Sequence, residues 1–171
     1  MNVRTARALF TITGIVLTVC VFAMQQFPSV ASAAEYEALK NVKSAKAVFD
    51  VRIGQPVSAA GHLKLILQTY KDLRQAGKKP KFVVLFSGPS VRLISGNTDG
   101  FNPPEVRVLH QIAHTVSEMS KDGIKLEICL VAVKAFHVDP SSVLPQIKKV
   151  PNGWIALIGY EAQGYSLVPA Y

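Results

Sequence analysis

Cys129, in the segment EICLVAVKAF (127–136), is the side chain with the clearest capacity for covalent chemistry. A cysteine thiolate is a nucleophile, and the reactivity of a cysteine depends on whether its surroundings stabilise the negative charge of the thiolate. The other cysteine, Cys20, falls in an apolar run near the N-terminus. Cys129 is therefore open to three interpretations: a small buried hydrophobic residue, half of an intermolecular disulfide, or a reactive thiol.

Two histidines offer a second kind of chemistry. His110 and His114 are four residues apart and Glu118 follows one turn later, which is a spacing that metal ligands use on a helix. They lie on the flank of an apolar stripe without a third convergent ligand, so a solvated helix face is the favoured interpretation and no metal site is predicted. No G-x-G-x-x-G, G-x-x-x-x-G-K-[ST], H-E-x-x-H or G-x-S-x-G motif occurs, and no cofactor is predicted.

The elements that would position Cys129 alternate between short apolar runs and longer stretches with helical periodicity. The apolar runs predict strands at 47–53, 81–88, 124–131, 147–150 and 165–168. The periodic stretches predict helices at 58–76, 104–121 and 154–163, with Asn152 as the N-cap of the last. If the third strand ends near Ile128, the residues 130–136 turn into a helix whose N-terminus lies at Cys129.

Strands separated by helices imply right-handed crossovers and parallel pairing. The predicted fold class is therefore α/β: a three-layer sandwich with a mostly parallel, about five-stranded sheet of Rossmann-like topology. Functional groups in such folds collect beyond the carboxyl ends of the strands. The loops of interest follow Ile53, Phe86 and Ile128, and Cys129 belongs to the third.

The predicted site combines Cys129 with residues of these loops. Gly88, in FSGPS, either exposes backbone N–H groups to a small anion or serves only as the glycine of a turn. A helix N-terminus at Cys129 and a nearby Lys134 would favour the thiolate, whereas apolar neighbours would favour the neutral thiol. His62 would be a proton partner only if it reaches across the crevice. The residues expected to line the pocket are Gly54, Gln55, Pro56, His62, Ser87, Gly88 and Lys134.

The N-terminal residues have the layout of an export signal. Two arginines precede the apolar run ALFTITGIVLTVCVFAM, and Ala-Ser-Ala ends at residue 33. We expect a signal peptide over 1–33, a polar lead-in over 34–46 and one domain over 47–171, periplasmic or secreted after cleavage. The alternative is an uncleaved anchor that leaves the domain outside the cytoplasm, because the run approaches the length of a membrane span.

The composition of the domain limits its partners. The chain has a net charge of +8, and residues 1–33 hold only two of its 19 lysine and arginine residues, so the domain is basic. These charges are spread out, without an arginine cluster or interleaved aromatic residues, so no nucleic acid is expected as a partner. Contact with a membrane is expected only through an uncleaved N-terminus. A single cysteine allows no internal disulfide, and the fold must be held by its core.

Three segments together resemble the DsrE/DsrF-like family of small α/β sulfur-handling proteins. They are VVLFSGPSVRLI at the second strand, EICLVAVKAFHVDP at the third, and VLPQIKKVPNGWIALIGYEAQGYSLVP at the C-terminus. The correspondence runs from about residue 47 to 169. The C-terminal segment, with Val150-Pro151, Gly153 and Gln163-Gly164-Tyr165, is most similar to the exported, stand-alone branch of the family.

The resemblance implies a function for the predicted site. It implies that Cys129 carries sulfur as a persulfide, and that the protein acts as a sulfur carrier or in the manner of a sulfurtransferase. It also implies a homo-oligomer that exchanges sulfur with a donor or acceptor protein. The alternative is a non-catalytic binding or oligomeric assembly module in which Cys129 is a buried structural residue.

Overall fold

The structure is a computed structural model that describes residues 36–171. The predicted signal peptide or anchor over 1–33 lies outside the described residues. Within the described part, the polar lead-in contains one 3-10 turn, η1 (Glu37–Leu39), before the first strand begins at Lys46. None of the helices in this part has both the length and the apolar character needed to cross a membrane.

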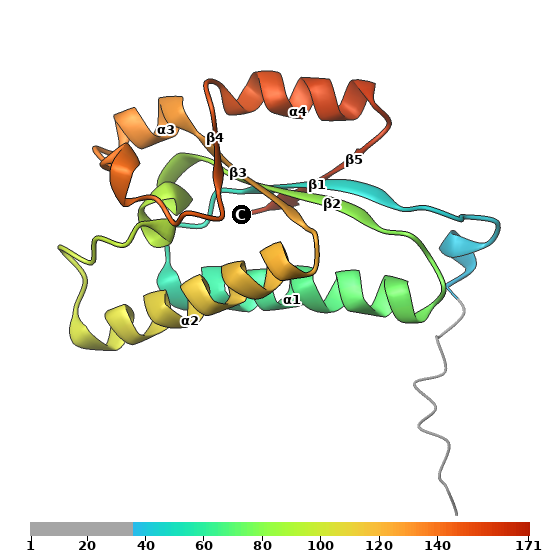
Figure 1. The fold of residues 1–171 in the computed structure, drawn as a ribbon, viewed down its shortest axis with the longest axis horizontal. Helices are drawn as coiled ribbons and strands as arrows, with labels where there is room; N and C mark the ends of the chain where they lie inside the picture. The colour runs from blue at the N-terminus through green and yellow to red at the C-terminus, as the bar shows by residue number, and fades with distance from the viewer. Residues whose placement is uncertain (1–35) are drawn as a thin grey trace, which may run out of the picture. The chain divides into compact units, whose positions relative to one another are not determined.

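Five strands form one sheet in which every neighbouring pair is parallel (Figure 1). The strands are β1 (Lys46–Val51), β2 (Lys81–Phe86), β3 (Lys125–Cys129), β4 (Lys148–Val150) and β5 (Ser166–Ala170). Their order across the sheet is β4-β3-β2-β1-β5. The carboxyl ends of β1, β2 and β3 therefore meet at one edge, as the predicted fold class requires.

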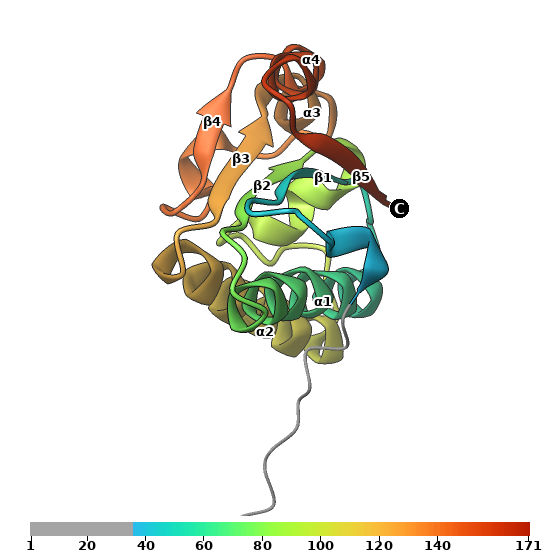
Figure 2. The same ribbon diagram turned by 90° about the vertical axis from the view of Figure 1, so that its right-hand side faces the viewer.

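The helices cover both faces of the sheet, which makes three layers (Figure 2). One face packs against α1 (Pro56–Gln75) and α2 (Pro103–Lys121), whereas α3 (Leu130–Ala135) and α4 (Gly153–Ala162) lie on the other. The first pair is long and the second is short. The second face is consequently covered by less protein. The last residue of β3, Cys129, points toward this face, where it meets α4.

Local sequence signals explain where the long helices begin. Asn102 caps α2 by accepting a hydrogen bond from the Glu105 N–H, and the Glu105 side chain accepts one from the Asn102 N–H. Proline stands at the first position of both α1 and α2, where its missing N–H costs no hydrogen bond. Pro56 thus begins α1, two residues before the predicted start, and does not belong to a loop.

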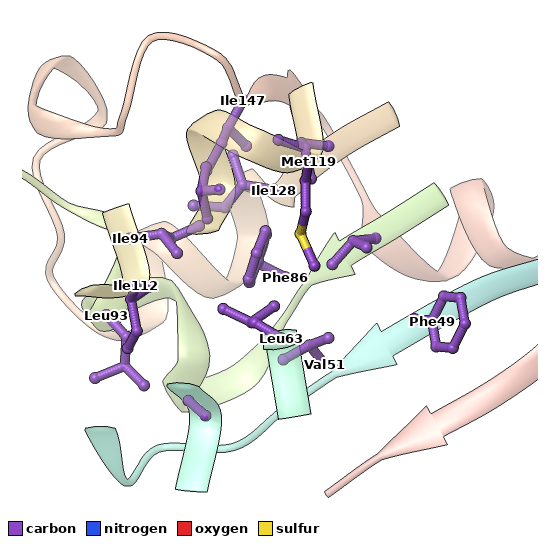
Figure 3. Close-up of a cluster of buried hydrophobic side chains, with 14 of the residues drawn as sticks. Phe49, Val51, Leu63, Phe86, Leu93, Ile94, Ile112, Met119, Ile128 and Ile147 are labelled. Carbon is purple, nitrogen blue, oxygen red and sulfur yellow. The ribbon is translucent and has the colours of Figure 1, made fainter. Parts of the chain in front are cut away.

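The main core lies between the sheet and the pair α1 and α2 (Figure 3). Val51, Phe86 and Ile128, from three adjacent strands, meet Leu63 of α1 and Ile112 of α2, and all five are almost fully buried. A smaller cluster on the other face joins Val48, Val83 and Leu85 to Leu157 of α4. The larger core fixes the three strands whose ends carry the candidate site.

The long connection after β2 is more ordered than the turn-rich sequence indicates. Gly88–Ile94 form a 3-10 segment, η2, whose residues Val91 and Ile94 are fully buried. The Ser90 hydroxyl donates to the carbonyl oxygens of Val51 and Ser87, at 2.7 and 2.8 Å. These bonds hold the end of β2 against the end of β1. A third 3-10 element, η3 (Pro140–Ser142), follows α3.

Candidate functional site

Cys129 is the last residue of β3 and the N-cap of α3. The strand therefore ends one residue later than Ile128. The residue is only 7% exposed. Its Sγ accepts a hydrogen bond from the Gly153 N–H at 3.1 Å. Because Gly153 is the first residue of α4, the sulfur lies at the positive N-terminal end of that helix, where negative charge is favoured.

The local sequence explains why this N–H reaches the sulfur. A Cβ atom at residue 153 would lie 3.0 Å from Cys129 Cβ and 3.2 Å from Cys129 Sγ, so glycine permits the close approach of the helix. The predicted N-cap Asn152 is confirmed, since its side chain accepts from the Trp154 N–H at 2.9 Å. The cap fixes the direction in which the first turn of α4 presents its N–H groups.

Cys129 borders a cavity of about 320 Å³ at the carboxyl edge of the sheet. Ser87, Gly88 and Arg52 contribute to its wall from the ends of β2 and β1. The rest of the wall is mainly apolar and comes from α3 and α4, with the side chains of Val131, Ala132, Ala135, Phe136, Trp154 and Leu157. The cavity thus combines the Cys129 side chain and the side chain of one arginine with a largely apolar wall.

A buried polar network supports the Arg52 side of this cavity. Asp50 is only 1% exposed. Its two carboxylate oxygens accept hydrogen bonds from Ser87 Oγ at 2.7 Å and from Arg52 Nε at 2.8 Å. Val51, Phe86 and Ile128 are aligned across the strands, so Arg52, Ser87 and Cys129 are each the next residue along their chains. Asp50 therefore fixes Arg52 at the same level as the thiol.

A second buried carboxylate lies two residues before Cys129. Glu127 Oε1 accepts a hydrogen bond from the Tyr160 hydroxyl of α4 at 2.8 Å, whereas its buried Oε2 has no partner among the described residues. Burial of Tyr160, together with this hydrogen bond, raises the pKa of Tyr160 above its ordinary value of 10.0. This hydrogen bond joins α4 to β3 two residues before Cys129.

The raised pKa gives an expected pH dependence. The folded state holds the Tyr160 proton more tightly than the unfolded state, so this contribution to stability is complete below about pH 10 and is lost as the pH rises toward the folded pKa. Tyr160→Phe should lower the free energy of unfolding near neutral pH by about 1 to 2 kcal/mol. It should also make the decline at alkaline pH shallower, as measured by urea unfolding. Tyr36→Phe, at an exposed tyrosine, should change neither, and an equally steep decline in Tyr160→Phe would contradict the assignment.

The structure brings together part of the predicted site. Ser87 and Gly88 line the same cavity as Cys129. Gly88 has a φ of +55°, a conformation that favours glycine, which agrees with its interpretation as a turn residue. A helix does follow Cys129, with Leu130 as its first residue.

The predicted loop 54–56 lies apart from the cavity wall. A Cβ atom on Gly54 would come within 2.9 Å of Pro89 Cβ, so this glycine allows the loop to pack closely against η2. Gln55 is exposed at the N-cap of α1, and its carbonyl oxygen accepts from the Ala59 N–H. Pro56 is buried as the first residue of α1. None of the three contributes to the wall around Cys129.

His62 and Lys134 also lie away from the thiol's cavity. His62 borders a separate groove of about 740 Å³ beside β5, and its Nδ1 is 2.9 Å from the Ser58 carbonyl oxygen. Lys134 is exposed on α3 and does not line the cavity of Cys129. The geometry therefore places neither residue as a direct partner of the sulfur.

The histidines of α2 lie in another part of the molecule. His110, His114 and Glu118 border a groove between α1 and α2, and His114 Nδ1 is 3.6 Å from Glu118 Oε2. Within residues 36–171 no group of three or more histidine, cysteine, aspartate or glutamate residues is arranged to hold a metal ion.

Asp50, Arg52 and Glu127 are the site residues that sequence reasoning missed. A signal for two of them exists, because Asp50 and Glu127 are charged residues inside apolar strands, and a buried charge needs a partner. Nothing local indicated Arg52, since its role depends on the pairing of β1 with β2. The Gly153 N–H could not be found either, because it approaches Cys129 from 24 residues further along the chain.

Comparison with known proteins gives a relative in sequence and several solved structures with a similar fold. No protein-family model matches this chain. A protein of Aquifex aeolicus strain VF5, described only as uncharacterized, is 29% identical over 127 residues, which cover 72% of this chain and 55% of that protein. The chain thus spans about half the length of this relative.

The solved structure of MTH1491 from Methanobacterium thermoautotrophicum, a protein of unknown function, matches with a TM-score of 0.58 at 14% identity. The match covers 73% of this chain and 98% of that one. The ychN protein from E. coli has a TM-score of 0.46 at 9% identity, over 73% of this chain and 98% of its own. The likeness to MTH1491, together with the all-parallel sheet, confirms the predicted α/β fold class.

Proposed function

We propose that this protein binds sulfane sulfur on Cys129 as a persulfide and relays it to an acceptor thiol. The observation that carries the proposal is the hydrogen bond from the Gly153 N–H to Cys129 Sγ in the wall of a cavity. A terminal persulfide sulfur carries negative charge, and the N-terminus of a helix favours such a group. The resemblance to a sulfur-handling family supports the same chemistry.

The proposed reaction is a thiol exchange that needs no oxidant or reductant. The Cys129 thiolate attacks a sulfane sulfur of the donor, a bond forms between the two sulfur atoms, and the bonding pair of the cleaved bond leaves with the remainder of the donor. In the return step an acceptor thiolate attacks the outer sulfur, and the Cys129 thiolate departs. The cavity provides the space into which the outer sulfur extends.

Mass spectrometry of the intact protein tests this proposal. After incubation with inorganic polysulfide and removal of the excess, the wild type should gain the mass of one sulfur atom, and a reductant should remove it. Cys129→Ser should gain none. An undiminished adduct on Cys129→Ser, or no adduct on the wild type, would show that Cys129 does not carry sulfur.

A non-catalytic role also has an observation in its favour, because Cys129 is almost completely buried and belongs to the hydrophobic core cluster. In that role the domain presents a binding surface and the thiol only packs. Titration of the native thiol separates the two proposals. Labelling that is slow in the native protein and fast only after denaturation favours packing, whereas measurable native labelling through the cavity favours the relay.

We also propose that the protein forms a homo-oligomer through its α3 and α4 layer. Trp154, Ile155 and Ile158 are each 67% to 69% exposed on α4, and Val131 of α3 is 57% exposed and lines the same cavity as Trp154. Since Leu157 packs inward, α4 is apolar on both sides, and helices of this kind are normally covered. The same apolar face on a second copy offers a surface of matching chemistry.

Charged substitutions on this face should therefore reduce the size of the assembly. The double variant Ile155→Glu, Ile158→Glu should elute as a smaller species than the wild type in size-exclusion chromatography with light scattering. Val57→Glu introduces one charge at an exposed apolar position of α1, on the other face of the sheet, and should leave the assembly unchanged. A wild type that is monomeric at high concentration would contradict the proposal.

The N-terminal sequence supports a further proposal, that the domain works outside the cytoplasm. Residues 1–33 have the charge, the apolar run and the small residues of an export signal. The N-terminal residue of protein recovered from its native cells tests this. A start near residue 34 supports cleavage, whereas a start at Met1 with membrane association supports an anchor.

A further inference from the structure

We infer that the sulfur donor of this site is an anion of the sulfonyl type, R–SO₂–S⁻ with an organic group R, and that Arg52 selects it. The inference rests on the proposed function and names the class of molecule that the cavity accepts. It depends on three features of the described residues: the single charge in the cavity wall, the way this charge is held, and the apolar character of the remaining wall.

Arg52 is the one charged residue among the described residues that line the cavity of Cys129. Its Nε is committed to Asp50, whereas its two terminal nitrogens make no hydrogen bond to residues 36–171. A guanidinium with a free edge recognises paired oxygen atoms of an anion by two parallel hydrogen bonds. The two terminal nitrogens of Arg52 are therefore suited to bind a ligand with two such oxygens.

The guanidinium is held in place from two sides. Buried Asp50 accepts from Nε, and the Tyr171 ring lies 5.7 Å from the guanidinium carbon. Burying a carboxylate is costly, and a buried charge inside a strand is more readily explained by a task at the strand's end than by stability. An arginine held in this way needs little reorganisation when a ligand arrives.

The position of Arg52 relative to Cys129 suits a donor of a few atoms. The two residues follow β1 and β3, which are separated by β2 and hence by about 10 Å between strand axes. The arginine side chain and a small sulfonyl compound can span this separation together. The apolar side chains of Val131, Phe136 and Trp154 would pack against the group R.

The reaction with this donor is balanced, and it gives the positive charge of Arg52 a role in the transition state. The Cys129 thiolate attacks the sulfane sulfur, a new S–S bond forms, and the bond between that sulfur and the sulfonyl sulfur breaks. The bonding pair leaves on a sulfinate, R–SO₂⁻, so the products are one persulfide anion and one sulfinate anion. Negative charge grows on the sulfonyl oxygens during the step, and a cation beside them stabilises the transition state more than the bound donor.

The test compares an anionic donor with a neutral thiol reagent. With benzenethiosulfonate, Arg52→Gln should form the Cys129 persulfide about 10 to 100 times more slowly than the wild type, and Arg52→Lys should fall between them. Alkylation by iodoacetamide, which is neutral, should change by no more than about threefold in the same variants, because it does not use the guanidinium. Arg107→Gln removes a similar charge from exposed α2 and should leave both rates unchanged.

A measurement on the wild type keeps the test independent of how the variants fold. Benzenesulfinate, the expected leaving group, should slow iodoacetamide labelling of Cys129, whereas neutral benzenesulfonamide should not. Inorganic thiosulfate, which lacks R, should react more slowly than benzenethiosulfonate if the apolar wall contributes.

The outcomes separate this inference from the proposed function. Equal losses with both reagents in Arg52→Gln, no loss with either, or the absence of protection by benzenesulfinate would overturn the role of Arg52. A wild type that takes sulfur from polysulfide but not from benzenethiosulfonate would overturn the donor class and leave the relay intact. A wild type that takes sulfur from no donor would remove the proposed function itself.

Discussion

Gly153→Ala should slow persulfide formation on Cys129 by about tenfold or more. The added methyl group would lie 3.0 Å from Cys129 Cβ, 3.2 Å from its Sγ and 3.3 Å from Leu85 Cδ2, and all three neighbours are fixed in the sheet or beside it. The first turn of α4 must then move outward, which lengthens the hydrogen bond to the sulfur. We expect overpacking to lower the free energy of unfolding by about 1 to 3 kcal/mol as well.

Gly159 provides the matched control for this prediction. It belongs to the same helix, and a Cβ atom there would meet nothing within 4 Å. Gly159→Ala should therefore leave the rate unchanged and raise stability by up to about 1 kcal/mol, since alanine favours a helix more than glycine does. The rates come from the mass-spectrometric assay and the stabilities from urea unfolding. If Gly153→Ala reacts as fast as Gly159→Ala, the N–H to sulfur bond has no part in the chemistry.

Asp50→Ala should lower the free energy of unfolding by about 3 kcal/mol. The substitution removes both hydrogen bonds of a carboxylate that is almost inaccessible to solvent, leaving the Ser87 hydroxyl and Arg52 Nε without their partner. A void also remains beside β2. Because Arg52 loses the group that fixes it, the preference of the site for anionic donors should weaken at the same time.

Asp72→Ala separates this effect from the loss of a carboxylate in general. Asp72 accepts a hydrogen bond from Gln68 Nε2 at 2.7 Å, but both residues are exposed on α1. Its replacement should cost less than about 0.5 kcal/mol, because exposed polar pairs contribute little. Chemical unfolding of the two variants under the same conditions makes the comparison. Similar decreases in the free energy of unfolding of both variants would mean that the burial of Asp50 does not increase its contribution to stability.

The fold was predictable because its signals are local. The apolar runs of β2 and β3 and the periodic stretches of α1 and α2 are long enough to distinguish strand from helix, and the spacing between strands then determines parallel pairing. The ends of the elements were less certain. Pro56 reads as a turn residue in sequence but begins α1, and the segment after Gly88 packs into the core because Val91 and Ile94 are apolar at the spacing of a tight helix.

The position of the candidate site was predictable only where it depends on the end of a strand. Cys129, Ser87 and Gly88 follow from the position of β3 and β2 alone. The position of the Gly153 N–H at the sulfur and that of Arg52 in the cavity wall depend on contacts between segments that are distant in the sequence. No local sequence pattern predicts such contacts. Leu130 and Val131, directly after the cysteine, offer no side-chain donor, and the sulfur instead accepts a hydrogen bond from the backbone N–H of Gly153 at the start of α4. His62 was predicted to line the cavity of Cys129, but it borders a different groove. Its place near the start of a helix does not determine on which face of the sheet the side chain lies.

The placement of Cys129 beneath the first turn of α4 also determines which oxidation products the protein can form. A disulfide requires its two Cα atoms to lie within about 7 Å of each other. A second copy cannot bring its own Cys129 so close, because Cys129 is only 7% exposed and Gly153 packs directly against its sulfur. Mild oxidants should therefore give sulfenic acid on separate chains, without covalent dimers. The exported homo-oligomer proposed above would therefore remain free of cross-links in an oxidising compartment.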